Sequence, residues 1–214
     1  MAPPLAALSD WQNFYVVVGS AAAGLTGLTF VVIALAADAQ MVRLSGLRAF
    51  ITPIVVHFGT VLWLAALLCI PGHNRTSLAL CMIGTALIGA VYALTTTYRM
   101  VRTLPDYRPV AADWIWNAVL PLLSHGVLLA AGLMTAAHAP LALYLIGAVA
   151  LTLLYVGIHN AWDLAVWITA ERPSARAKHE AQDQSDTAAA TPAATEAASA
   201  GDSPEADVRL PRPP

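Results

Sequence analysis

Long apolar stretches separated by short polar segments dominate the first 170 residues of the chain. A helix needs about 20 mostly apolar residues to cross a bilayer, and five stretches are that long. They cover residues 11–37, 50–70, 77–98, 114–137 and 140–168. The apolar–polar alternation of strands is missing from them, and an open sheet leaves backbone groups unsatisfied in lipid. The pattern therefore predicts an all-α fold, an integral membrane bundle of five transmembrane helices.

The composition supports this fold class and excludes others. Hydrophobic residues make up 58% of the chain and charged residues only 11%, whereas soluble domains carry about 25% charged residues. An ordinary soluble enzyme and a nucleic-acid-binding protein, which needs a clustered basic surface, are both excluded. We expect a transmembrane domain at 1–170. The remainder, 171–214, is rich in Ala, Thr, Ser and Pro, and we expect it to be a disordered cytoplasmic tail.

Basic residues alternate between rich and poor segments along the predicted topology. Cytoplasmic loops of membrane proteins carry an excess of Lys and Arg. The rich segments hold Arg43 and Arg48, then Arg99, Arg102 and Arg108, then Arg172, Arg176 and Lys178, whereas the segments between them hold only Arg75. This alternation predicts an N-terminus outside the membrane and a cytoplasmic C-terminus.

Small residues recur at four-residue intervals in the first predicted helix, at Gly19, Ala23 and Gly27. Such spacing lets another helix approach closely in lipid, either inside the bundle or in a homodimer. In the fourth helix, Pro121 has no N–H to bond the carbonyl of Asn117, so we expect a kink there.

Four ionisable residues lie inside the predicted spans, namely His57, His125, His159 and Asp163. Such groups are costly in lipid and usually face the protein interior or a water-filled cavity. His159 and Asp163 are separated by four residues, so their side chains can meet on one helix face. His73, in a predicted loop, is expected to be solvated.

Three interpretations of these polar residues remain open. In the first, they hydrogen-bond one another and hold the helices in register. In the second, they carry protons or ions, because a carboxylate beside an imidazole favours the imidazolium. In the third, they hold a haem or a metal ion, with His125 and His159 as candidate ligands. No cofactor is predicted from a defined motif.

Cys69 and Cys81 lie near the outer ends of two consecutive predicted helices. A disulfide is conceivable in an oxidising exterior, and buried free thiols are the alternative, because cysteine packs as a small hydrophobe. The sequence leaves their pairing open.

The opening of the first helix, Trp11-Gln-Asn-Phe-Tyr-Val-Val-Val-Gly followed by Gly24-Leu-Thr-Gly-Leu-Thr-Phe-Val, resembles a family of small bacterial multi-pass membrane proteins. The stretch that begins His57-Phe-Gly-Thr and ends Leu-Leu-Cys-Ile-Pro71 is similar too. Some members of the family are labelled modulators of a membrane-bound AAA protease. The resemblance implies a multi-pass protein of the bacterial cytoplasmic (inner) membrane, and it supplies no catalytic residues.

For function, the sequence favours a non-enzymatic membrane scaffold or a modulator of another membrane complex. Nucleotide-binding motifs, nucleophile–base patterns and repeat symmetry are all missing from it. Its expected contacts are the lipid bilayer and either a membrane protein partner or a second copy of the chain. A small proton-coupled transporter or channel using the His/Asp cluster is the first alternative, and a haem- or metal-binding membrane redox protein is the second.

Overall fold

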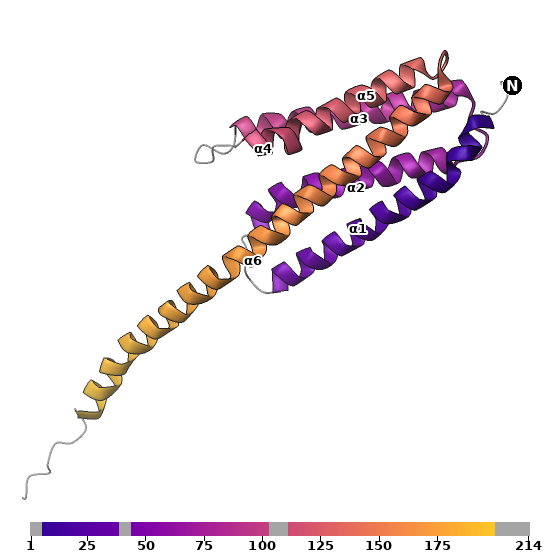
Figure 1. The fold of residues 1–214 in the computed structure, drawn as a ribbon. Coiled ribbons are helices and arrows are strands. Elements are labelled where there is room, and N and C mark those ends of the chain that lie inside the picture. The colour runs from indigo at the N-terminus through magenta and orange to yellow at the C-terminus, as the bar shows by residue number, and fades with distance from the viewer. Residues whose placement is uncertain (1–5, 39–43, 103–110, 200–214) are drawn as a thin grey trace, which may run out of the picture. The chain divides into compact units, whose positions relative to one another are not determined.

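Every regular element that the structure describes is a helix (Figure 1). The structure is a computed structural model, and it describes residues 6–38, 44–102 and 111–199. The elements are η1 (Ala6–Trp11), α1 (Gln12–Asp38), α2 (Leu44–Cys69), α3 (Arg75–Arg102), α4 (Ala111–Trp114), η2 (Ile115–Val119), α5 (Leu120–Met134) and α6 (Ala139–Ser199). Of these, η1 is a 3-10 helix and η2 is a π-helix.

The prediction of an all-helical fold is confirmed, and within the described part of the chain five helical segments are long and apolar enough to cross a bilayer. They are Leu8–Ala34, Ile51–Cys69, Arg75–Arg102, Ala111–Met134 and Ala139–Val166. The fourth span is not a single α-helix, since it consists of α4, η2 and α5 in succession. All five spans lie in the first of two compact units, Met1–Ile168.

The second unit, Thr169–Pro214, holds the segment that the sequence predicts to be a disordered cytoplasmic tail, and that expectation stays a prediction. Its described backbone is helical as far as Ser199, and residues 200–214 lie outside the described part of the chain. Alanine, the strongest helix former, recurs throughout 175–199. Local propensity therefore favours a helix here even though the segment offers few large side chains to bury.

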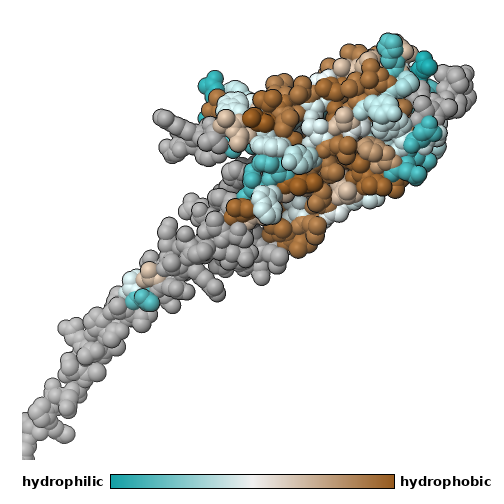
Figure 2. Space-filling view, in the orientation of Figure 1, coloured by the Kyte–Doolittle hydropathy of each residue, from teal (hydrophilic) through white to brown (hydrophobic). Residues whose placement is uncertain are grey.

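Large apolar side chains cover the outside of the first unit, as lipid contact requires (Figure 2). Val17 is 68% exposed, Ile88 76% and Leu133 66%. Side chains of the same kind, among them Phe58 and Leu64, are fully buried inside. The helices are thus apolar on both faces, so their packing depends on shape and on a few polar contacts.

The first part of α6 is the central helix of the bundle, and half of its span is buried, against 22–39% for the other spans. In Figure 1 it passes across the α1–α2 pair and the α3–α5 pair. Gly147 leaves room for Trp11 and Phe14, and Gly157 leaves room for Phe58 of α2. Two glycines on one helix therefore admit aromatic side chains from its neighbours.

The small residues predicted to form one groove on α1 lie on two different faces of the helix. Gly19 is buried, and a Cβ at that position would lie 2.7 Å from the Cβ of Ala65 on α2. Ala23 and Gly27 are exposed, and nothing lies within 4 Å of a Cβ placed on Gly27. Positions four apart drift by about 40° around a helix of 3.6 residues per turn. Intramolecular packing therefore uses Gly19 and leaves the rest of the groove open.

Gly19→Leu is expected to lower the free energy of unfolding by about 1–3 kcal/mol, the cost typical of overpacking, because the new side chain must displace Ala65. Thermal unfolding in detergent measures the change. Gly126→Leu is the matched control, since Gly126 is exposed with open space around it. Equal destabilisation in both variants would contradict the packing of Gly19 against α2.

Candidate functional site

The four ionisable residues singled out by the sequence separate into two groups. His57 on α2 and His125 on α5 are buried, with 4% and 3% of their surfaces exposed. His159 and Asp163 on α6 are more accessible, with side-chain exposures of 28% and 64%. The first pair is therefore sealed in the bundle, whereas the second pair reaches its surface.

His125 is held in one orientation by the backbone of its own helix. Its Nδ1 lies 2.7 Å from the carbonyl oxygen of Pro121, and a carbonyl only accepts, so Nδ1 carries the hydrogen. The ring lies against α3, where its Nε2–Cδ2 edge occupies the space that a Cβ at Gly89 would need. Nε2 has no hydrogen-bond partner among the described residues.

His57 is the second buried imidazole with an unpartnered nitrogen. Its Nδ1 makes no hydrogen bond within the described part of the chain, and the ring lies near enough to His125 for the two to interact electrostatically. The structure thus brings His57 and His125 into the same region. The register-holding interpretation expected a hydrogen bond between such residues. None joins these two described rings.

Pro121 coincides with a change of helix type. The π-helix η2 precedes it, and Leu120 donates its N–H to the carbonyl oxygen of Ile115, five residues back. Ser124 Oγ donates to the carbonyl oxygen of Leu120 at 2.8 Å. The sequence predicts a kink at this point, where proline breaks the regular hydrogen-bond ladder. The structure shows the π turn η2 just before it.

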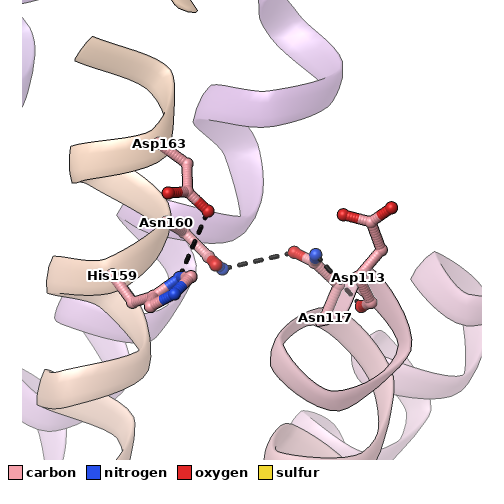
Figure 3. A network of polar contacts seen from close by, with 5 residues as sticks. All are labelled: Asp113, Asn117, His159, Asn160 and Asp163. Atoms are coloured by element: carbon pink, nitrogen blue, oxygen red, sulfur yellow. Dashed lines mark hydrogen bonds and ion pairs between the residues drawn. The ribbon is translucent and has the colours of Figure 1, made fainter. Parts of the chain in front are cut away.

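The π-helical turn carries the residues that contact α6 (Figure 3). The rings of Trp116 and His159 are stacked, with centroids 3.8 Å apart and planes 13° apart. Asn160 Nδ2 donates to Asn117 Oδ1 at 3.2 Å, and Asn117 Nδ2 donates to the carbonyl oxygen of Asp113 at 3.2 Å. One π turn therefore presents an aromatic ring and an amide side by side to the central helix.

His159 and Asp163 meet as their four-residue spacing predicts. His159 Nδ1 lies 3.3 Å from Asp163 Oδ2, within ion-pair distance, although the angles are not those of a hydrogen bond. The imidazole therefore has an indole on its face and a carboxylate at its edge.

Asn160, and the contacts of Trp116 and Asn117 with α6, are the parts of this site that the sequence analysis missed. A signal was present, because Asn160 is a polar residue beside His159 in an apolar span, where uncharged amides also seek partners. Only ionisable residues were predicted as site residues in this span. It assigned Asn117 to the proline kink alone.

His73 is a second correction to the sequence analysis, because it is 8% exposed rather than solvated. Its Nε2 lies 2.9 Å from the carbonyl oxygen of Leu67, and its Nδ1 lies 2.9 Å from Ser77 Oγ. These bonds join the end of α2 to the start of α3. The role of His73 in the turn is therefore structural.

Cys69 and Cys81 are both free and half-buried. Both pack against the main apolar core of the bundle. The structure thus shows them as thiols that pack as small hydrophobes, the alternative to the conceivable disulfide.

His125 and His159, the candidate ligands for a haem or a metal ion, make separate contacts. His159 stacks on Trp116, which precedes His125 by nine residues, or about 13 Å of helical rise. Within 6–38, 44–102 and 111–199, no group of three or more His, Cys, Asp or Glu side chains could hold a metal ion. A ligand set for that interpretation rests on the two histidines alone.

Gly89→Ala is expected to destabilise the protein by about 1–3 kcal/mol, because the added methyl group collides with the His125 ring. In a His125→Ala background the same change should cost little, since the ring is gone. Chemical denaturation of the two single variants and the double variant measures this coupling. Additive losses would contradict the contact between Gly89 and His125.

Comparisons of the chain with protein-family models, with curated proteins and with solved structures find no match. The resemblance of the first helix to small bacterial membrane proteins therefore stays a prediction.

Proposed function

We propose that the protein is a non-enzymatic component of the bacterial cytoplasmic membrane that binds another integral membrane protein as a scaffold or modulator. The observation that carries this proposal is the outer face of α1. Ser20, Ala23, Gly24 and Gly27 are all exposed on it. Nothing lies within 4 Å of a Cβ placed on Gly24 or on Gly27.

A face of this kind suits a partner helix because of how helices associate in lipid. Apolar side chains gain little from helix contact, since lipid tails are equally apolar, so small residues that let two backbones approach closely decide the association. Inside this bundle, Gly19 and Gly157 serve that purpose against α2. The same device on the outside of α1 leaves room for the backbone of a second protein.

The cavities of the bundle favour a binding role over small-molecule chemistry. One, of about 110 Å³, is lined mainly by apolar residues of α1, α2 and α6, including Leu25, Ile54 and Leu164. Another, of about 140 Å³, lies between α5 and α6. Ligand pockets for small molecules are usually about 300–1,000 Å³, so these two are small for a substrate.

The polar contacts of the spans point in the same direction. Asn160 bonds Asn117 across α6 and η2, and Trp63 Nε1 donates to Thr85 Oγ1 across α2 and α3 at 3.2 Å. These bonds hold neighbouring helices together, as expected for a structural role. The transporter and redox alternatives need several imidazoles at one site. The imidazoles of this bundle contact different partners, so both alternatives rank below the scaffold.

The proposed orientation places the N-terminus outside and the C-terminus in the cytoplasm. Arg99 and Arg102 lie in the last turn of α3, at the end that this orientation makes cytoplasmic. Arg75 lies at the opposite end, where its guanidinium donates to the carbonyl oxygen of Ala136 at 3.0 Å. The excess of basic residues at one end follows the positive-inside rule.

Topology reporters test this orientation. A reporter that works only in the cytoplasm is expected to be active when it is fused after residue 214. A reporter that works only outside the membrane is expected to be active when it is inserted beside Arg75. The physical reason is that the number of predicted spans between the two positions is odd, so the positions lie on opposite sides of the membrane. Reporters on the same side would overturn the span count or the orientation.

Gly24→Leu and Gly27→Leu test the partner-binding face. We expect each to abolish the higher-mass complexes that crosslinking in native membranes gives with the wild-type protein, because the leucine side chain fills the groove. Mass spectrometry of the crosslinked species distinguishes a second copy of this chain from another protein.

Gly126→Leu on α5 is the control for these two variants, because it places the same side chain on another exposed and open position. It should leave the complexes intact. A wild-type protein that remains monomeric in membranes, or complexes that survive Gly24→Leu and Gly27→Leu, would contradict the proposal.

A further inference from the structure

The contact between Trp116 and His159 has an unusual position in the bundle. It joins the central helix α6 to η2, the π-helical turn that precedes Pro121 in the fourth span. Tyr155, one turn before His159, also lies against Trp116, with ring centroids 5.6 Å apart. The indole therefore contacts two aromatic side chains of α6.

The strength of this contact depends on the charge of His159. A neutral imidazole and an indole attract each other as two flat aromatic rings. An imidazolium adds a cation–π attraction to the indole face and a Coulomb attraction to the carboxylate of Asp163, 3.3 Å away. Both additions act only on the protonated ring. Gain of a proton therefore tightens the hold of α6 on η2.

The groups around His159 reinforce this dependence. On its own helix the charged neighbour is Asp163. On the facing segment, Asn117 Nδ2 donates to the backbone carbonyl oxygen of Asp113, so Asp113 joins the network in Figure 3 through its backbone. On α2, which packs against α6 at Gly157, the buried titratable residue is His57.

We propose that His159 is a proton-controlled latch that clamps the π-helical turn η2 to α6. When His159 is protonated, the Trp116 stack and the Asp163 pair hold η2 in its π conformation. When it loses the proton, the attraction that depends on charge is lost and the hold on η2 weakens. This inference goes beyond the partner-binding role of α1 and does not depend on it.

The π turn gives the latch something to control. A π turn contains one residue more than the α turn it replaces, and π turns in α-helices are frequent at functional sites. Conversion to an α turn would rotate the residues before it by about 100° relative to α5. The residues that would rotate include Asp113 and Trp114. The latch thus sets which side chains α4 presents at this end of the bundle.

Tryptophan fluorescence of the full-length protein in lipid nanodiscs tests the latch. A protonated imidazole in contact with an indole quenches its emission. We therefore expect the wild-type protein to lose emission reversibly in one transition as the pH falls from 8 to 5. Trp116→Phe should remove the transition, whereas Trp63→Phe, which changes a tryptophan bonded to Thr85 on α3, should keep it.

His159→Phe is the decisive variant, because phenylalanine retains the stack and cannot take up a proton. It should abolish the transition while leaving the helix content unchanged. His159→Gln serves the same purpose if the phenylalanine variant fails to fold. A transition that persists without His159 or without Trp116, or a wild-type protein with no transition between pH 8 and 5, would overturn the latch.

Hydrogen exchange provides a readout that a purely structural contact would not change. After correction for the intrinsic pH dependence of exchange, amides of α4 and η2 should be better protected at pH 5 than at pH 8 in the wild type. In His159→Phe their protection should be the same at both values. Equal protection at both pH values in the wild type would also overturn the latch.

Discussion

Lipid offers no hydrogen bonds, and the local structure of the five spans depends on this constraint. Each backbone group must be satisfied within the protein, so the helices are long and hydroxyl side chains bond back to their own turns, as Thr26 and Thr60 do. Pro121 cannot donate to that ladder. The π turn η2 precedes this proline, and the side chains of Ser124 and His125 donate to the carbonyls of Leu120 and Pro121.

The sequence predicts the number of spans because apolar length is a local property that needs no partner. It also predicts the meeting of His159 with Asp163, since a four-residue spacing fixes two side chains on one face. It predicts a kink of the fourth span at Pro121, and the π turn η2 lies just before that residue. These features share one property, namely that a single helix determines them.

The features that the sequence does not predict all depend on how neighbouring helices are rotated about their axes. The stack of Trp116 on His159 and the bond between Asn117 and Asn160 require η2 and α6 to face each other. The π form of η2 is a further feature that the sequence does not predict. The division of the small residues on α1 between Gly19 inside and Gly27 outside is a further case.

The two kinds of helix contact in this bundle differ in how much they resist change. Gly19 and Gly157 admit neighbouring side chains into close packing, and displacing such groups costs about 1–3 kcal/mol. The η2–α6 contact relies on an interhelical amide bond, worth about 0.6 kcal/mol on average in membrane proteins, and on a ring stack beside a partly exposed carboxylate. The close packing of α1 and α6 against α2 is therefore the rigid part of the bundle. The contact between η2 and α6 is the weaker of the two.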